Sequence, residues 1–180
     1  MATALLKYLD NDRHYHTFTH IGDMLSDLED FFPEHRDNMV LKYAIAYHDC
    51  IYDATSKDNE WDSATAACKE LYELLDSARM SQVVELIMVT QDHVPNNDPL
   101  SKIIIDLDLS GLSSLLYKGN SDKIRKEYSM FTDREWREGR IAFLNKFLNR
   151  QVYQTEQFAN LEKLAKLNME RELDYLLGLQ

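Results

Sequence analysis

The residues of this sequence that most directly suggest chemistry are its histidines. They are six in number: His14, His16, His20, His35, His48 and His93. Three of them fall within the segment RHYHTFTH, where His16 and His20 are four residues apart and would share one face of a helix. Two imidazoles on one face can bind a metal ion or contact a phosphate. Pairs with this spacing are also common on solvated faces, so the pair alone decides nothing.

A second candidate is the doublet His48-Asp49, which ends an apolar run in YAIAYHDCIYD, residues 43–53. Burying both groups without partners would be costly. A neutral imidazole nitrogen and an ionised carboxylate oxygen are ligands for Mn²⁺, Fe²⁺, Ni²⁺ or Zn²⁺, and for Mg²⁺ with further oxygens. The alternative is a simple helix end, where His48 interacts with the helix dipole and Asp49 begins the next turn.

Two carboxylates within the apolar segment IIIDLDL favour the metal-site interpretation over a simple helix end. Asp106 and Asp108 alternate there with isoleucine and leucine, and a buried carboxylate is expensive unless a positive charge neutralises it. A metal ion held by His20, His48 and Asp49 would supply that charge. The order His, His-Asp, Asp on separate segments therefore indicates one shared site.

Other residues could contact a phosphate or a nucleobase. His93 ends the segment TQDH and could line the same cleft, or it could simply end a helix. Arg125 lies in the densest group of cations, DKIRKEY at 122–128, and its guanidinium suits phosphate oxygens. A solvated basic face also explains this group. Trp61 and Trp136 are expected in the core or an interface, although one of them could stack on a base.

These residues must be positioned by helices. Apolar spacing predicts helices over residues 17–32, 38–49, 56–78 and 81–93, followed by a loop at 95–99. The segment 100–112 fits either a strand or a short buried helix. Three more helices are expected within 122–131, 134–150 and 156–178. With only 5 Gly and 3 Pro, the chain is predicted to be all-α.

Composition limits the classes of partner. A chain of 180 residues suits a single domain, and its net charge of −11 disfavours general nucleic-acid binding and anionic membrane surfaces. The two cysteines, Cys50 and Cys68, form no CxxC and indicate a reducing compartment. No apolar run is long enough to span a bilayer, and the start MATALLKYLDNDRHYH lacks the pattern of a secretory signal. We therefore predict a cytoplasmic protein.

Taken together, RHYHTFTHIGDML, YHDCIYD, NEWDSA and DLDLSGL resemble the HD-domain superfamily of metal-dependent phosphohydrolases, and more narrowly a bacterial and phage branch of it. The resemblance covers about residues 10–130 and implies a helical HD-type domain over 1–180. The helices of 131–180 would pack on it or form an interface, for instance in a homodimer. The implied metal ligands are His20, His48, Asp49 and one of Asp106 or Asp108. Asp108 is favoured because Asp108-Leu109 resembles the last step of the family motif.

The resemblance implies hydrolysis of a small phosphorylated metabolite, most plausibly a nucleotide, with a divalent ion among Mn, Fe, Ni, Mg and Zn. Asp53 could hold or deprotonate the attacking water, and His16, His93 and Arg125 could contact the phosphate. The best-known nucleotidase branches have a Glu shortly after His-Asp, where this chain has Tyr52 and Asp53. Two alternatives remain open: a binding module with a structural metal, and a metal-free helical interaction protein.

Overall fold

The computed structural model of the protein describes residues 3–178, so the outermost two residues at each end of the predicted 1–180 domain lie outside the description. Within this part the chain is all-α, as predicted, and contains no strand. The α-helices are α1 (Phe18–Phe31), α2 (Met39–Tyr47), α3 (Asn59–Leu71), α4 (Ser77–Asp92), α5 (Pro99–Asp108), α6 (Tyr117–Glu127), α7 (Asp133–Leu148) and α8 (Glu162–Gly178). The 3₁₀ helices are η1 (Ala4–Leu9), η2 (Pro33–His35), η3 (Leu109–Ser113) and η4 (Ala159–Leu161).

Side-chain caps set where several helices begin. The side chain of Thr17 accepts a hydrogen bond from the backbone of Thr19 and starts α1, and Asn38 does the same for α2. At α7, Thr132 and Glu135 form a complete capping box. Each such cap satisfies a backbone N–H that the helix leaves without a partner and contributes about 1 kcal/mol.

The segment 100–112 forms a helix, which settles the strand-or-helix alternative. Asp98 caps it and Pro99 occupies its first turn, where the missing N–H of proline costs nothing. The run Ile103 to Ile105 is buried throughout, whereas Lys102 of the same helix is exposed. The predicted helix over 56–78 is α3, which ends at Leu71, and α4 begins at Ser77, earlier than predicted, because Asp76 accepts a hydrogen bond from the backbone N–H of Arg79.

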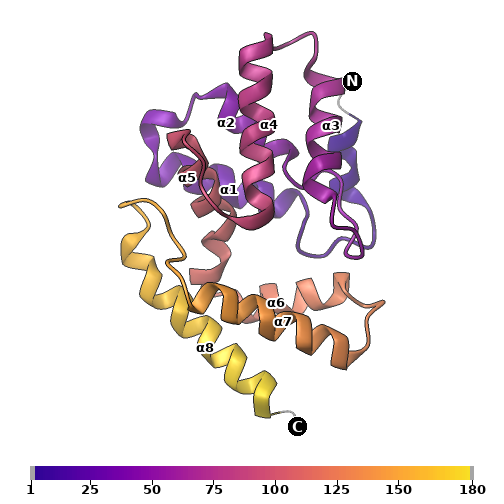
Figure 1. Ribbon diagram of the computed structural model, residues 1–180, viewed down its shortest axis with the longest axis vertical. Coiled ribbons are helices and arrows are strands. Elements are labelled where there is room, and N and C mark those ends of the chain that lie inside the picture. Colours follow the sequence, from indigo (N-terminus) through magenta and orange to yellow (C-terminus); the bar gives the residue numbers. More distant parts are fainter. Residues whose placement is uncertain (1–2, 179–180) are drawn as a thin grey trace.

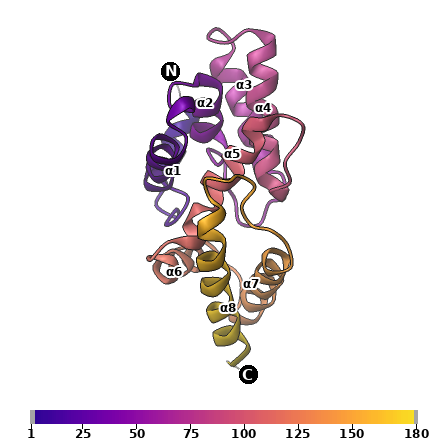
Figure 2. The same ribbon diagram turned by 90° about the vertical axis from the view of Figure 1, so that its left-hand side faces the viewer.

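The helices form two groups along the long axis of the molecule. Figure 1 shows α1 to α5 in one group and α6 to α8 in the other. In the first group α4 packs against α2, α3 and α5; in the second α8 packs against α7 and η3. Figure 2 shows α5 leading from the first group toward the second. The direct continuation of α5 into η3 therefore links the two groups at the residue that ends α5, Asp108.

One hydrophobic core runs through both groups. It includes Leu41 and Ile45 of α2, Leu86 of α4, Leu144 of α7 and Met169 of α8, all with 0% exposure. Each such side chain stabilises the fold by about 1.5–3 kcal/mol through burial. The second group of helices thus packs on the first as part of the same domain. No helix in residues 3–178 is long and apolar enough to cross a membrane.

A buried ion pair joins the last three helices. Arg140 of α7 donates to both carboxylate oxygens of Glu172 on α8, at 3.1 and 2.9 Å. The hydroxyls of Tyr117 and Ser121 on α6 also donate to Glu172. The side chains of Arg140 and Glu172 are 7% and 9% exposed, so the pair is shielded from water and well hydrogen-bonded.

Candidate metal centre

Four of the predicted metal ligands lie together. His20, His48, Asp49 and Asp108 each offer one ligand atom, and these atoms all lie within 4.8 Å of one another. His20 lies in the first turn of α1, His48 follows the last residue of α2, and Asp108 ends α5. The cluster therefore forms where the ends of three helices meet, although the three segments are far apart in the sequence.

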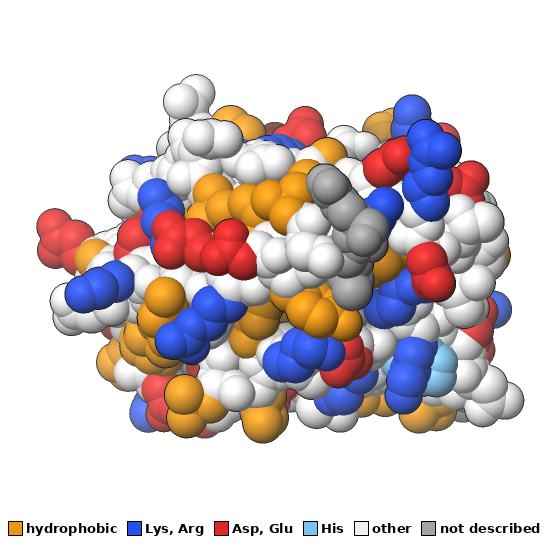
Figure 3. All heavy atoms as spheres, turned by 90° about the horizontal axis from the view of Figure 1, so that it is seen from below, with side chains coloured by type: hydrophobic (Ala, Val, Ile, Leu, Met, Phe, Trp, Pro, Cys, Tyr) orange, Lys and Arg blue, Asp and Glu red, His pale blue; other side chains and the backbone are white. Residues whose placement is uncertain are grey.

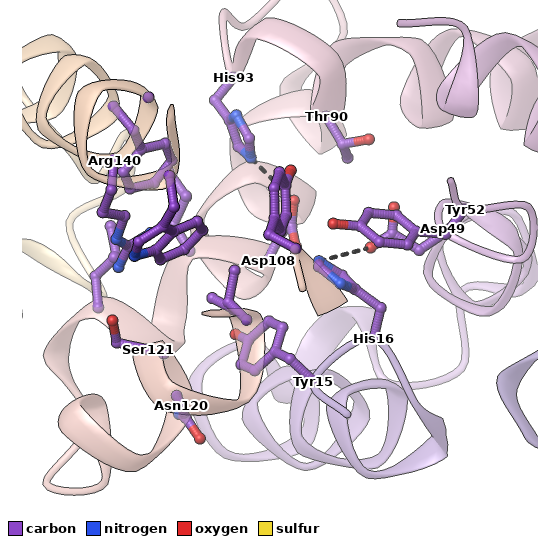
Figure 4. Close-up of a pocket in the computed structure, with 18 of the residues that line it drawn as sticks. Tyr15, His16, Asp49, Tyr52, Thr90, His93, Asp108, Asn120, Ser121 and Arg140 are labelled. Carbon is purple, nitrogen blue, oxygen red and sulfur yellow. Dashed lines mark hydrogen bonds and ion pairs between the residues drawn. The ribbon is translucent and has the colours of Figure 1, made fainter. Parts of the chain in front are cut away.

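Asp108 is the centre of the contacts within the cluster. One of its oxygens, Oδ1, lies 3.1 Å from Nε2 of His20 and 3.5 Å from Nε2 of His48. Its other oxygen lies 3.0 Å from Nε2 of His93, as Figure 4 shows. Nε2 of His48 also lies 3.1 Å from Oδ2 of Asp49. Three imidazoles thus surround one carboxylate.

His48 shows how this arrangement fits a cation. Its Nδ1 lies 2.9 Å from the carbonyl oxygen of Ile45, so Nδ1 carries the hydrogen that the carbonyl accepts. In the neutral ring Nε2 then presents a lone pair toward the oxygens of Asp49 and Asp108. Nε2 is buried and has no hydrogen-bond partner among the described residues. A positive charge between Nε2 and these oxygens, a proton or a metal ion, would remove the repulsion.

The pKa shifts of the cluster have the same cause. Burial lowers the pKa of His48, but the carboxylates of Asp49 and Asp108 outweigh it and raise that pKa well above its ordinary value. Burial tends to raise the pKa of both carboxylates. The neighbouring histidines have the larger effect, so the pKa of each carboxylate is lowered. The site therefore holds its carboxylates ionised and attracts positive charge.

The donor set and the spacing both fit a divalent ion. Two imidazole nitrogens and two carboxylate oxygens suit the transition metals, and further oxygens would suit Mg²⁺. Opposite ligands of an octahedral ion about 2.1 Å away stand roughly 4.2 Å apart. The observed spread of up to 4.8 Å would close by small movements of side chains. His20, His48, Asp49 and Asp108 could thus hold a metal ion.

Arg13 fixes the backbone that carries His48 and Asp49. Its guanidinium donates to the carbonyl oxygen of Asp49 at 2.7 Å and to that of Cys50 at 3.0 Å. The side chain is buried between the rings of Tyr8 and Tyr52, whose centroids lie 5.1 and 5.8 Å from it. Sequence reasoning missed this role, because a single arginine gives no sign that it will reach a helix end 36 residues away.

His16 lies beside the cluster and is held by Glu127. Its Nδ1 is 2.6 Å from a Glu127 oxygen, and its Nε2 is 3.7 Å from Oδ2 of Asp49. The other oxygen of Glu127 accepts the backbone N–H groups of residues 14–16. Burial lowers the pKa of His16, but Asp49 and Glu127 outweigh it and raise that pKa. His16 precedes α1, so it reaches the cluster without the helical register expected from its spacing to His20.

Tyr15 and Gly111 form a tight contact that supports this side of the cluster. The ring of Tyr15 lies 5.1 Å from that of His20. A Cβ at Gly111 would lie 2.7 Å from the Tyr15 hydroxyl oxygen, too close for any side chain without a shift. Glycine at this position therefore lets Tyr15 pack against the imidazole.

The structure does not bring Asp53 or Arg125 to the cluster. Asp53 is exposed, and hydrogen bonds from the side chain and backbone of Thr55 hold its carboxylate and lower its pKa. Arg125 donates to the carbonyls of Tyr128 and Phe131 and pairs with Asp133 at 2.8 Å. These contacts stabilise the turn between α6 and α7. Neither residue lines the cavity at the cluster.

Asp106 has a structural environment of its own. Its two oxygens accept hydrogen bonds from the backbone of Gln154 and Thr155 and from the Thr155 hydroxyl, at 2.6 to 2.8 Å. Burial outweighs these bonds and raises its pKa to about 6. Asp106 thus ties α5 to the segment before α8, and Asp108 lies in the cluster.

A cavity of about 510 Å³ opens beside the cluster. In Figure 4, Asp49, His16 and Tyr52 lie on one side of it, and Ser121 and Arg140 lie on the other. Glu60 of α3 also lines the cavity and is half-buried. Burial, with the carboxylate of Asp49 nearby, raises the pKa of Glu60. Sequence reasoning did not single out this residue, although it lies in the motif NEWDSA.

Comparison with protein-family models, with curated proteins and with solved structures finds no match to this chain. The structure itself establishes a helical domain with a buried His/Asp cluster that could bind metal, beside a cavity. This arrangement is compatible with an HD domain.

Proposed function

We propose that the protein is a metal-dependent phosphohydrolase of the HD superfamily, acting on a small phosphorylated metabolite of the nucleotide class. The observation that carries the proposal is the buried Nε2 of His48, which faces two carboxylate oxygens and has no hydrogen-bond partner among the described residues. This atom belongs to a four-residue cluster at one end of a cavity of ligand size.

In this proposal His20, His48, Asp49 and Asp108 hold one divalent ion. Such an ion polarises a phosphoryl oxygen and makes a water molecule more acidic. His93 supports the site through Asp108, 3.0 Å away. It has a left-handed backbone with φ of 52°, an uncommon conformation for a residue other than glycine. His16, oriented by its contact with Glu127, contacts a phosphate oxygen.

We assign the base that accepts the proton of the attacking water to Glu60. Four carboxylates line the cavity: Asp49, Glu60, Asp108 and Glu135. Two belong to the cluster, and Glu135 is used in the capping box of α7. Glu60 is the remaining one; it is half-buried, and burial raises its pKa. The sequence analysis had suggested Asp53 for this role.

The test is phosphate release by metal-stripped protein before and after Mn²⁺ is added. A panel of nucleotides and sugar phosphates is the substrate set. We expect release of inorganic phosphate only with metal, and its loss in Asp49→Ala. Asp30→Ala, which removes an exposed aspartate on α1, is the matched control and should keep the activity. Metal binding without release from any substrate would contradict the proposal and favour a binding module.

A further inference from the structure

The cavity extends well beyond the metal-binding cluster. From Asp49 and Asp108 it continues between α6 and α7, so only one end of its 510 Å³ volume touches the cluster. The far end must therefore accommodate the part of a substrate that does not react. Its lining gives the chemistry of that part.

The cavity has an aromatic wall, formed by Tyr128, Phe131, Trp136 and Phe143, and Tyr128 connects it to Tyr52, which is stacked on His16. The rings of Tyr128 and Trp136 have centroids 5.3 Å apart. The Arg140 guanidinium lies 4.8 Å from the Phe143 ring centroid and 5.9 Å from that of Trp136, which restrains both rings. A flat apolar group such as a nucleobase can stack on a wall of this kind.

One polar group at this end has no partner. Asn120 lines the cavity, is half-buried and makes no side-chain hydrogen bond within residues 3–178. Figure 4 shows it near Ser121, whose hydroxyl is already bound by Glu172. An asparagine amide offers one donor group and one acceptor, which match the edge of a base.

The charges of the cavity limit the number of phosphates. Four carboxylates line it, and among the described lining residues Arg140 is the only Lys or Arg. Arg140 is already paired with Glu172 through two hydrogen bonds. A divalent ion at the cluster can contact one phosphate directly. Further phosphates would meet carboxylates without an unpaired cation to balance them.

Other cations lie nearby but in a separate groove of about 840 Å³, lined by Lys118, Arg125, Arg134, Arg137 and Arg171 among others. Tyr117, Ser121 and Trp136 line both spaces and so lie between them. Arg125 and Arg134 already form ion pairs with acidic side chains. Figure 3, which looks onto the end of the molecule formed by α6 to α8, shows basic side chains mixed with acidic and hydrophobic ones. These cations therefore do not face a phosphate held at the cluster.

We infer that the cavity binds a nucleoside monophosphate, with its phosphate at the cluster and its base against Trp136, and that it rejects nucleoside di- and triphosphates. The inference rests on the proposed function. In the reaction a water oxygen forms the new bond to phosphorus and the bond from phosphorus to the ester oxygen breaks. The ester oxygen takes up a proton, so the products are a nucleoside and inorganic phosphate.

The test compares AMP, ADP, ATP and ribose 5-phosphate on the Mn²⁺-loaded protein. Calorimetric binding and phosphate release are both measured, so binding selectivity is read even without turnover. We expect AMP to bind at least about tenfold more tightly and to react at least about tenfold faster than the other three. Stacking and charge should each contribute about a factor of ten. Trp136→Ala should weaken the binding of AMP about tenfold and change the binding of ribose 5-phosphate by no more than about twofold. Trp61→Ala, an exposed tryptophan on α3, is the control.

A second variant tests the charge argument without removing an aromatic ring. Glu135→Gln removes one carboxylate from the cavity lining while Gln can still form the capping box of α7, so it should reduce the preference for AMP over ADP in both measurements. Equal binding of AMP, ADP and ATP by the wild type would overturn this inference, and so would equal binding of AMP and ribose 5-phosphate. Selective binding of AMP without phosphate release would overturn the proposed hydrolysis and leave the inferred specificity standing.

Discussion

Arg13 is the residue on which the geometry of His48 and Asp49 depends. Lysine in its place would keep the charge but could not donate to the carbonyls of Asp49 and Cys50 through one planar group. We expect Arg13→Lys to weaken Mn²⁺ binding about tenfold, the usual cost of losing a group that orients metal ligands. Calorimetric titration with Mn²⁺ measures this. Arg79→Lys, at an exposed position on α4, should bind like the wild type, and an unchanged affinity in Arg13→Lys would refute the role.

A substitution at Glu60 tests catalysis independently of metal binding. It lines the cavity but is not one of the four clustered residues. Glu60→Gln should therefore lower kcat about 100-fold, as expected for a lost general base, and leave the Mn²⁺ affinity unchanged. Glu73→Gln, just beyond the same helix and exposed, should change neither quantity. A wild-type kcat in Glu60→Gln would show that another group is the general base.

Three of the four clustered residues could be predicted because they are unusual where they occur, whereas His20 was predicted from its spacing to His16 and Asp108 was preferred to Asp106 because of the family resemblance. Asp108 and the pair His48-Asp49 interrupt apolar segments, so the residue pattern by itself calls for a reason for their burial. Arg13 and Glu127 could not be found in this way. Their roles depend on backbone carbonyls and amides that come near them only in the folded chain.

At the level of helices, the ion pair between α7 and α8 makes a prediction. Replacing Glu172 by Gln leaves Arg140 buried without its counter-charge and should cost about 3 kcal/mol of unfolding free energy. Urea unfolding measures the difference. Glu138→Gln, which removes an exposed partner of Arg134 on α7, should cost less than about 1 kcal/mol. Equal losses in the two variants would contradict a structural role for the buried pair.

The same pair predicts a dependence on pH. Burial raises the pKa of Glu172, but Arg140 outweighs it and lowers that pKa below its usual 4.5. The stabilisation is therefore complete above pH 4.5 and is lost as the pH falls through the lowered pKa of the folded state. The difference in unfolding free energy between wild type and Glu172→Gln should be constant near neutral pH and shrink in acid. A difference that stays constant into acid would contradict the assignment.

Local patterns left one element undecided and misplaced the end of another. The isoleucine run of α5 has no polar face, so its spacing could not separate a strand from a buried helix. The cap at Asp98 and the proline after it decide the matter locally. The predicted helix over 56–78 ran too far because its apolar residues continue past Leu71, while Asp76 is the cap of α4.

Viewed as a whole, the molecule places its cavity where the two groups of helices meet. The cluster is supplied by α1, α5 and the end of α2, and the aromatic wall by α7 and the turn before it. The all-α class followed from composition and periodicity. The cavity did not, because its walls come from segments more than 80 residues apart, such as Asp49 and Trp136. Its shape depends on how the helices pack.

The central claim is that His20, His48, Asp49 and Asp108 bind a divalent metal ion. Its most direct test is thermal unfolding of chelator-stripped protein with and without Mn²⁺. A ligand at 100 times its Kd stabilises the folded state by about 2.7 kcal/mol, which raises Tm by roughly 5–10 °C for a chain of this size. We predict this rise for the wild type and for Asp30→Ala, and no rise for Asp49→Ala. Equal Tm values with and without millimolar metal, or a full rise in Asp49→Ala, would contradict the claim.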